Sequence, residues 1–458
     1  MADEAYPIGP PAAAESYLVI ERLIRVAKAS GAEAIHPGYG FLAENADFAD
    51  ACRQAGLTFI GPPASALRSM GDKTAARRAA VTAGVPVVPG THEPIESDTE
   101  AGRLAREFGY PVMIKAAMGG GGKGMRLVRD EAELASALRM ARSEAGSAFG
   151  NASVYIERYL EEPRHIEIQI LADSHGNVVH LGERECSIQR RHQKLIEECP
   201  SPLIERRMRT RMGEAAAKVA SSVGYVNAGT VEFLVDRQKH FYFLEMNTRL
   251  QVEHPVTELV TGIDLVKEQI RIAAGEKLGY EQADIKWTGS AIECRIYAED
   301  PYANFMPSPG TITGLRTPSG PWVRDDSGVY EGYTVPIYYD PLISKLIVWG
   351  PERTEAIRRM ARALGEYKVA GVRTTIPILL HIMADPDFLA GRLSTHFLDH
   401  LLSADRPQTE SRHRTIALIA ASLAAHERTG QIQLSAPRSA GANLWLMSVR
   451  RGGWGRRS

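Results

Sequence analysis

The sequence predicts a multidomain protein that combines α/β and α+β parts, and three observations lead to this fold class. A chain of 458 residues is too long for one hydrophobic core and is expected to divide into about three units. Helix-like and strand-like segments alternate through roughly the first 160 residues, as they do in α/β proteins. From about residue 161 to 403 strands predominate, and helices at Glu355–Glu366 and Thr375–Met383 close this part.

The composition excludes several functional classes. Charged residues make up 24% and apolar residues 44% of the chain, which is typical of a globular enzyme. A net charge of -1 gives no reason to expect binding to nucleic acid or to an anionic membrane. The longest apolar run, Ile416 to Ala425, is too short to span a bilayer, and no secretory leader follows Met1.

The four cysteines stand at positions 52, 186, 199 and 294, without any C-x-x-C spacing. This pattern favours neither a zinc site nor a disulfide framework. Reduced, buried thiols in a cytoplasmic protein are therefore expected.

Turn-forming residues separate the elements in the first part of the chain: a turn-rich segment runs from His36 to Gly40, and a Gly-Pro-Pro sequence that begins at Gly61 ends a predicted strand. The expected elements are a helix at Ser16–Ser30, a strand at Ala34–Ile35, a helix at Ala43–Ala55, a strand at Leu57–Ile60, a helix at Asp72–Ala83 capped by Gly84, and an extended segment to Gly90.

A glycine-rich loop follows the predicted strand Val112–Ala116, and a second strand, Met125–Val128, comes directly after it. Glycine lets a backbone approach phosphates closely and present its N–H groups. A Rossmann fingerprint would open a helix, and a Walker A loop would have Ser or Thr after Lys123, so neither fits. The pattern favours a strand-loop-strand flap over a triphosphate, with Lys115 beneath it; the alternative is a structural glycine hinge.

Two further basic features are compatible with an anion site. Lys73 starts a predicted helix, whose first N–H groups favour anions. The polar run Gln189–Lys194 follows a predicted strand at Val178–Glu183 and is either a solvated turn or an anion cradle.

Polar residues occupy every second position from Glu245 to Glu253, so an extended chain would place them on one face. The segments Thr230–Asp236 and Phe241–Asn247 are typical of a hairpin, and a symmetric register with Asp236 opposite Phe241 puts Glu232 opposite Glu245. Like charges at such positions repel unless a cation lies between them. Two carboxylates and the Asn247 amide oxygen suit Mg²⁺ or Mn²⁺; the alternative is a solvated strand face.

The tail from residue 404 has nine arginines against three acidic residues, and residues 411 to 428 are compatible with one helix. The domain boundaries that these patterns predict are 1–60 for an N-terminal domain, 61–87 for a linker, 88–160 for a lid subdomain, 161–403 for a core with a C-terminal domain, and 404–458 for a basic tail that could begin a further domain.

At these residues the chain resembles the ATP-grasp superfamily, and specifically the biotin carboxylase component of biotin-dependent carboxylases. The resemblance covers about residues 1 to 403. It rests on the collinear motifs HPGYGFLAEN (36–45), MGDK (70–73), IKAAMGGGGKGM (114–125), PRHIEIQ (163–169), RRHQKLIEE (190–198), EMNTRLQVEHPVTE (245–258), IECRIYAEDP (292–301) and GYTVPIYYDPLISKL (332–346).

The resemblance implies a Rossmann-like pre-ATP-grasp domain, an ATP-grasp fold with a mobile glycine-rich lid, and a C-terminal biotin carboxylase domain. It also implies that ATP, Mg²⁺ (or Mn²⁺) and bicarbonate give carboxyphosphate, whose CO₂ passes to biotin on a carrier protein. Such phosphoryl transfer depends on positioning and charge neutralisation.

The resemblance also implies a role for individual residues in nucleotide binding, metal binding, bicarbonate binding and catalysis. Nucleotide contacts are expected from Lys73, Lys115, Gly119, Gly120, Gly121, Gly122, Gly124, Glu157, Leu160, His165, Gln189 and His192. Metal ligands are expected at Glu232, Glu245 and Asn247, and the bicarbonate pocket at Lys194, Arg249, Gln251 and Val252. Glu253 is expected to be the base that deprotonates bicarbonate, with Arg295 as the cation that stabilises the biotin enolate.

Three departures from the family pattern are visible. The chain begins after the family's first strand, glycine turn and helix, so its N-terminal domain is expected to be truncated, and a homodimer is expected only with those elements restored. Arg158 stands where Lys is common. No Met-Lys dipeptide occurs, so biotin is expected on a separate carrier.

The leading hypothesis is therefore a cytoplasmic biotin carboxylase subunit of an acetyl- or propionyl-CoA-type carboxylase, working with a biotin carboxyl carrier protein and carboxyltransferase subunits. Two alternatives stay open at this point. One is a different ATP-grasp ligase that forms an acyl phosphate, and the other is an inactive fragment that only binds carboxylase partners.

Overall fold

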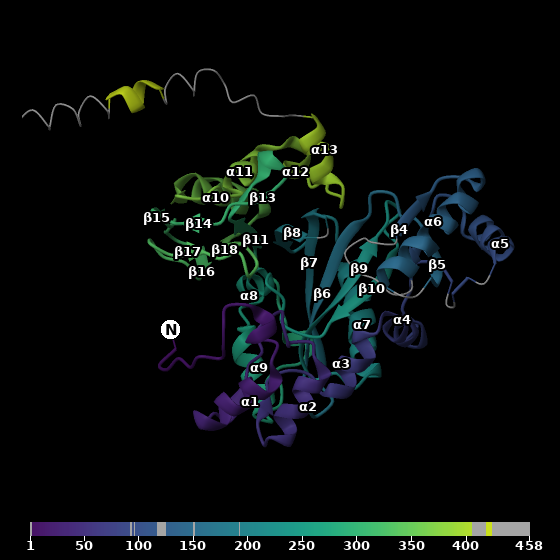
Figure 1. Ribbon diagram of the computed structural model, residues 1–458, viewed down its shortest axis with the longest axis horizontal. Coiled ribbons are helices and arrows are strands. Elements are labelled where there is room, and N and C mark those ends of the chain that lie inside the picture. The colour runs from purple at the N-terminus through teal and green to yellow at the C-terminus, as the bar shows by residue number, and fades with distance from the viewer. Residues whose placement is uncertain are drawn as a thin grey trace, which may run out of the picture. The chain divides into compact units, whose positions relative to one another are not determined.

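The computed structural model describes residues 2–91, 94–95, 97–116, 125–149, 152–191, 193–404 and 418–423. Residues up to Leu401 form one compact unit (Figure 1). The second unit is Leu402–Ser458, and within it residues 418–423 are helical; the rest of the helix predicted at 411–428 lies outside the described residues. The domain boundaries expected from the sequence stay predictions.

The centre of the first unit is an eight-stranded sheet in the order β10-β9-β6-β7-β8-β11-β18-β16, and every pair in it is antiparallel. Its strands are β6 Arg164–Ala172, β7 Val178–Arg190, β8 Gln193–Cys199, β9 Asn227–Val235, β10 Phe241–Asn247, β11 Ser290–Tyr297, β16 Val323–Ser327 and β18 Leu342–Gly350.

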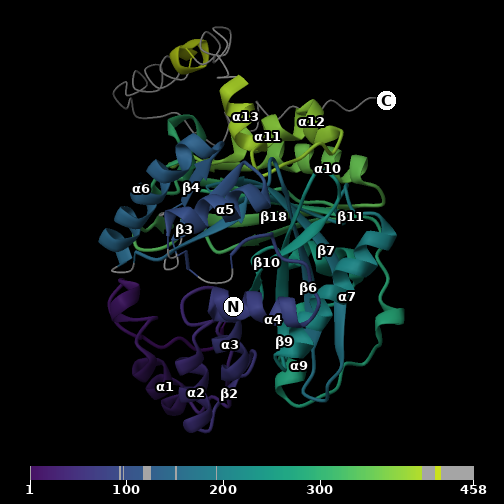
Figure 2. The ribbon, with the colours of Figure 1, turned by 90° about the vertical axis from the view of Figure 1, so that its right-hand side faces the viewer.

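The central strand β6 is buried along its whole length, and its two faces differ in chemistry. Ile166, Ile168 and Ile170 belong to a hydrophobic cluster with the apolar side of α7 (Arg206–Ser222), which lies against β6 and β7 (Figure 2). The alternate residues of β6 therefore point to the opposite face, and these include His165 and Glu167. One face of β6 is thus core; the other is buried too, and it is polar around His165 and Glu167 but apolar at Leu171, which packs in a second hydrophobic cluster with α9.

Further helices pack against the sheet and its flanks. They are α8 His254–Thr261, α9 Leu265–Ala273, α10 Arg353–Glu366 and α11 Ile376–Ala384. The helices expected at Glu355–Glu366 and Thr375–Met383 are thus confirmed as α10 and α11.

The lid subdomain contains a three-stranded antiparallel sheet in the order β4-β3-β5, covered by α5 Asp98–Phe108 and α6 Glu131–Phe149 (Figure 1). Its strands are β3 Val112–Ala116, β4 Met125–Val128 and β5 Val154–Arg158. The predicted strand-loop-strand is confirmed, because Val112 pairs with Val128 and Lys115 with Met125. The connecting loop, 117–124, lies outside the described residues.

In the N-terminal part the expected elements are all present, though most are shorter than predicted. They are α1 Ile20–Ala29, β1 Ala34–Ile35, α2 Ala46–Gln54, β2 Thr58–Phe59 and α4 Lys73–Thr82, together with α3 Ala64–Gly71. The strands β1 and β2 pair in parallel. The N-cap of α4 is Asp72, whose carboxylate accepts a hydrogen bond from the Ala75 N–H at 2.7 Å.

The remaining elements are short. They are η1 Ala13–Glu15, η2 Gln282–Asp284, η3 Pro301–Ala303, β12 Glu299–Asp300, β13 Met306–Pro307, β14 Gly310–Thr311, β15 Gly314–Arg316, β17 Thr334–Val335, β19 Lys368–Ala370, α12 Pro386–Leu389 and α13 Phe397–Ala404. Among the described residues, no helix is long and apolar enough to cross a membrane.

The β9–β10 hairpin confirms one register prediction and corrects another. Phe241 pairs with Val235 rather than with Asp236, so the predicted symmetric register is wrong at the turn. An irregularity between Phe243 and Glu245 then shifts the ladder by one residue, and Glu245 does pair with Glu232.

Two strand limits also differ from expectation. The strand β10 ends at Asn247, so the polar alternation up to Glu253 is not one extended strand; Glu253 instead occupies the N-cap position of α8. The strand β7 continues through Arg190 rather than ending at Glu183, and β8 begins at Gln193, so most of the polar run at 189–194 lies in two paired strands.

Candidate active site

The Lys194 ammonium lies at the centre of the polar face of the sheet. Its Nζ is 3.0 Å from Glu232 Oε1 and 2.6 Å from Glu253 Oε1, and it also bonds to Glu167. Burial lowers the pKa of Lys194, but the three carboxylates outweigh burial and raise that pKa well above its usual value. Lys194 is therefore charged at every working pH.

Beneath this cluster a fully buried guanidinium forms the floor of the site. Arg184 is 0% exposed and uses its donors on Gln169 Oε1 (2.6 Å), Thr257 Oγ1 (3.0 Å) and Gln251 Oε1 (3.0 Å). It also forms an ion pair with Glu167. A buried charge is tolerated only when it is paired and hydrogen-bonded, and Arg184 satisfies that condition.

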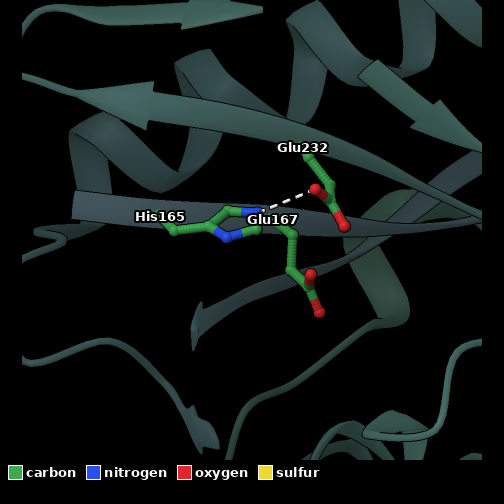
Figure 3. A group of neighbouring side chains, drawn as sticks. All are labelled: His165, Glu167 and Glu232. Atoms are coloured by element: carbon green, nitrogen blue, oxygen red, sulfur yellow. Dashed lines mark hydrogen bonds and ion pairs between the residues drawn. The ribbon is translucent and has the colours of Figure 1, made fainter. Parts of the chain in front are cut away.

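Glu232 is the most heavily bonded acid of the site. Its Oε2 lies 2.8 Å from His165 Nε2 (Figure 3), and its Oε1 accepts from Asn247 Nδ2 and Gln251 Nε2, both at 2.8 Å. Burial raises the pKa of Glu232, but Lys194 and His165 outweigh burial and lower it below its ordinary range. Burial lowers the pKa of His165, and Glu232 reverses that shift, so the net pKa is raised.

Glu253 and Arg295 form the second half of the cluster. Arg295 Nη2 is 2.8 Å from Glu253 Oε2, while its Nε lies 2.6 Å from Glu197 Oε1. Glu253 is only 1% exposed, and burial raises its pKa; Lys194 and Arg295 nonetheless lower that pKa well below its usual value. Glu253 is consequently an ionised carboxylate at neutral pH.

The other predicted bicarbonate residues lie at the edge of this cluster. Arg249 Nε is 2.8 Å from Glu44 Oε2, and its Nη2 is 3.1 Å from Asn247 Oδ1. Glu44 Oε1 also accepts from the Thr248 N–H at 2.9 Å, so the N-terminal part of the chain fixes this segment. The carbonyl oxygen of Val252 accepts from Lys345 Nζ at 2.9 Å.

The predicted nucleotide residues are divided among several elements. Glu157, on β5, accepts from both Lys115 and Arg77, the latter at 2.9 Å. Leu160 is buried two residues after the end of β5, and Gln189 pairs with Lys194 across β7 and β8. The loop glycines Gly119, Gly120, Gly121, Gly122 and Gly124, together with His192, lie outside the described residues.

The residues predicted to hold a divalent cation fit that task in chemistry. Glu245 pairs directly with Glu232, and burial and the Glu232 charge both raise the pKa of Glu245. A cation between these two carboxylates would remove this repulsion, and Asn247 would add an amide oxygen. Lys73, at the first position of α4, contributes the positive charge that partly offsets the repulsion.

Two other groups of side chains have ligand atoms close enough to hold an ion: His165, Glu167 and Glu232 (Figure 3), and Glu167, Cys186 and Glu253. In both groups the carboxylates already share the Lys194 ammonium. A positive side chain therefore occupies the position that a metal would need in either group, and the Glu232–Glu245 pair stays the predicted cation site.

Several members of this network were not predicted from the sequence, and among the charged ones are Glu44, Arg77, Glu167, Arg184 and Glu197. Glu167 could have been found, because His165, Glu167 and Gln169 alternate with isoleucines in the PRHIEIQ motif. Glu44 stands in the HPGYGFLAEN motif, but nothing local to Glu44 or Arg77 indicates its partner, because Arg249 and Glu157 are distant in sequence.

Two opposed carboxylates at the end of a β-hairpin, buried lysine and arginine side chains, and a lid subdomain with a glycine-rich connection define a ligase of the ATP-grasp class. Residues 72–281 match the family "Carbamoyl-phosphate synthase L chain, ATP binding domain". Residues 1–67 match the biotin carboxylase N-terminal domain, and residues 293–400 match the biotin carboxylase C-terminal domain. The chain belongs to the biotin carboxylase family.

Curated relatives agree with this assignment. The chain is 57% identical to a biotin carboxylase of Nostoc over 88% of this chain and 90% of that protein. It is 55% identical to biotin carboxylase 1 of Bacillus subtilis over 87% of this chain and 89% of that protein. The propionyl-CoA carboxylase alpha chain of Ruegeria pomeroyi is 48% identical, and the alignment covers 94% of this chain and 66% of that protein.

Solved structures agree as well. The biotin carboxylase domain of Hydrogenobacter thermophilus 2-oxoglutarate carboxylase, a dimer in complex with MgADP, ADP and bicarbonate, superposes with a TM-score of 0.81 at 50% identity over 87% of this chain and 88% of that chain. Biotin carboxylase from Campylobacter jejuni gives a TM-score of 0.79 at 49% identity over 84% and 86% of the two chains.

Proposed function

We propose that this chain uses ATP and bicarbonate to carboxylate biotin on a separate carrier protein, with carboxyphosphate as the intermediate. One observation carries the proposal: the ionised Glu253 carboxylate lies between Lys194 and Arg295, where an anionic substrate and a second acceptor can meet a proton acceptor. The bicarbonate and MgADP in the related H. thermophilus structure support the same function.

In the nucleotide half of the site, Lys73, Lys115 and the glycine-rich loop would contact the phosphates of ATP. Glu232, Glu245 and Asn247 would hold Mg²⁺ or Mn²⁺, which when bound neutralises phosphate charge. The adenine edge would meet Glu157 and Leu160, and His165, Gln189 and His192 are the residues assigned to the nucleoside and phosphates. Glu157 bonds to Lys115 in the present structure, so nucleotide binding would have to release that lysine toward the phosphates.

In the bicarbonate half, Lys194 and Arg249 supply positive charge, and Gln251 and Val252 complete the pocket. Glu253 then takes the bicarbonate proton. The ion pairs that keep Glu253 ionised also weaken it as a base. Bound bicarbonate would interact with the Lys194 ammonium and so weaken the ion pair between Lys194 and Glu253. Bicarbonate binding would therefore raise the proton affinity of Glu253 at the step in which the proton is transferred.

For the second step, Arg295 would stabilise the negative charge that develops on biotin. Arg295 is 8% exposed and is already held by Glu197 and Glu253. A guanidinium fixed in this way needs little reorganisation when charge appears beside it.

The partners and the location follow from this function. Biotin would arrive on a biotin carboxyl carrier protein and leave for carboxyltransferase subunits of an acetyl- or propionyl-CoA-type carboxylase. The longer alignment with the propionyl-CoA carboxylase alpha chain supports that type. The homodimer of the related domain supports a dimeric assembly. Four buried cysteines without a disulfide support a cytoplasmic location.

ADP release by the purified chain with Mg²⁺ and bicarbonate, measured with and without free biotin, tests the proposal. Release that requires bicarbonate and rises with biotin is the expected result. ADP release that does not change when biotin is added would favour another ATP-grasp ligase. ATP binding without any ADP release would contradict catalysis by this chain.

A further inference from the structure

Two buried acids lie near Arg295: Glu197 helps to hold its guanidinium, whereas Glu293 has no role in the scheme above. Glu197, on β8, and Glu293, on β11, pair directly across the two strands, and both are 0% exposed. Directly opposed side chains on neighbouring strands have Cβ atoms about 4.5–5.5 Å apart. The two carboxyl groups are therefore within reach of one another.

The hydrogen bonding of this pair is incomplete. Glu197 Oε1 accepts from Arg295, but Glu197 Oε2 and both oxygens of Glu293 receive no donor from the described residues. A buried carboxylate without donors is strongly destabilised, whereas a protonated carboxyl is neutral and is itself a donor. One proton shared between the two groups would satisfy Glu197 Oε2.

The charged neighbours of Glu293 favour the same protonation state. Glu197 on β8 and Glu253 at the start of α8 oppose a negative charge on Glu293, while Lys345 on β18 and Arg295 on its own strand favour it. Lys345 already donates a hydrogen bond to the Val252 carbonyl, and Arg295 already donates to the carboxylates of Glu197 and Glu253. Burial, the largest influence, and Glu197 together raise the pKa of Glu293 well above its usual value.

The other titratable groups around the pair do not change this balance. On α8, burial and Lys345 lower the pKa of His254 to about 3, so His254 is neutral, and Glu258 is paired with Arg324 at 2.8 Å. Glu198 points to the opposite face of the sheet, where it bonds to Arg353 of α10.

We propose that Glu293 is a positioning residue: it remains a neutral carboxylic acid, donates its proton to Glu197, and so leaves Glu197 Oε1 and Glu253 as the two anionic partners that orient Arg295. Ionisation of Glu293 would place a third carboxylate beside Arg295 and a further negative charge near Glu253. The pair thereby sets the alkaline limit of the pH range in which Arg295 and Glu253 keep their arrangement. This inference rests on the proposed function for its kinetic readout alone.

The variant that tests it is Glu293→Gln, which is neutral and nearly isosteric. The kcat of bicarbonate-dependent ADP release should fall less between about pH 7 and about pH 9 in the variant than in the unaltered protein, because the variant has no proton to lose at position 293. Glu197, whose pKa burial raises to about 7, is present in both proteins. An alkaline limb that does not move would overturn the link between Glu293 and the site. Loss of turnover at every pH would also overturn it, since a carboxylate would then be required.

Two readouts do not depend on turnover. Infrared difference spectra should contain the C=O stretch of a protonated carboxylic acid at neutral pH in the unaltered protein but not in Glu293→Gln; without that band the inference fails. Because the unfolded chain ionises near the usual pKa of Glu while the folded chain keeps the proton, Glu293 costs increasing stability as pH rises. The Tm advantage of Glu293→Gln should therefore grow from about pH 5 to about pH 8. An advantage that does not vary with pH would contradict the inference.

Asp173→Asn is the matched control. Asp173 is 2% exposed. Burial raises its pKa, but hydrogen bonds from Asn177 and from the N–H groups of Leu278 and His175 outweigh burial, so the net pKa is lowered. Its folded pKa is thus depressed, so this variant should lose Tm at neutral pH and leave the alkaline limb of kcat unmoved. If the unaltered protein shows no bicarbonate-dependent turnover, the proposed function fails, and the infrared and stability readouts decide the inference.

Discussion

At the scale of single residues, the site is a set of buried charges. Burying any one of them alone would be unfavourable, but together they form ion pairs that stabilise one another. Glu167, Glu232 and Glu253 are each nearly inaccessible to solvent, and the ion pairs with Lys194 compensate for their burial. Removing one member leaves its partners buried and unpaired, which typically costs about 3–5 kcal/mol, on the order of the whole stability margin of many domains. Conservative variants are therefore the informative ones here.

Glu253→Gln is such a variant. It keeps the shape of the side chain and a hydrogen-bonding oxygen, but it cannot take a proton at neutral pH. We expect bicarbonate-dependent ADP release to fall by about 10²-fold or more, the usual scale for loss of a general base. ATP affinity, measured by calorimetry, should stay unchanged, because Glu253 contacts none of the predicted nucleotide residues in the described structure. Turnover close to that of the unaltered enzyme would remove Glu253 from the role of base.

At the scale of elements, the polar face depends on how tightly the opposite face packs. Gly213 in α7 lies so close to β7 that an added Cβ would be 2.3 Å from His180 Nε2. That ring cannot retreat freely, because it stacks on Trp287 at 6.0 Å between ring centroids. The close approach of α7 fixes β6 and β7, which carry Glu167 and Arg184.

Gly213→Ala should consequently destabilise the protein by about 1–3 kcal/mol, the range for an overpacked core. Urea unfolding followed by circular dichroism measures the loss. The matched substitution is Gly102→Ala in α5, where the nearest atom to an added Cβ is 4.0 Å away; it should be neutral or stabilise by about 0.5–1 kcal/mol. Equal effects of the two substitutions would show that the helix conformation, and not the contact with His180, governs the result.

The same scale separates what the sequence could predict from what it could not. Periodicity predicted β9, β10 and the strands on both sides of the glycine loop, and it placed Glu232 opposite Glu245. It could not predict the irregularity at Leu244 that restores this pairing after a turn of different register. Nor could it predict that Glu253 lies outside the strand, at the N-cap position of α8, because that depends on packing of the helix against β11 and β18.

At the scale of the whole first unit, the site is assembled from segments that are distant in sequence. Glu44, in the N-terminal part, reaches across to the Thr248–Arg249 segment, 204 and 205 residues further along the chain. Its two oxygens bond to the backbone and hydroxyl of Thr248 and to the Arg249 guanidinium. The N-terminal part is therefore a structural component of the predicted bicarbonate pocket.

This contact predicts that Glu44→Gln selectively weakens bicarbonate use. Without the carboxylate, Arg249 loses its charged partner and its orientation, so the KM for bicarbonate should rise by about tenfold, as when one charge-assisted hydrogen bond of about 1.5 kcal/mol is lost. The KM for ATP should stay constant, because Glu44 contacts none of the predicted nucleotide residues in the part of the chain that the structure describes.

Asp47→Asn provides the comparison for Glu44→Gln. Asp47 lies in the same part of the chain, and its ion pair with Arg68, at 3.2 Å, is exposed on both sides. Exposed pairs of this kind contribute about 0–1 kcal/mol, so neither KM should change appreciably. If both variants raised the bicarbonate and ATP KM values together, the N-terminal part would act through general stability; a change confined to bicarbonate in Glu44→Gln alone would establish that it orients Arg249.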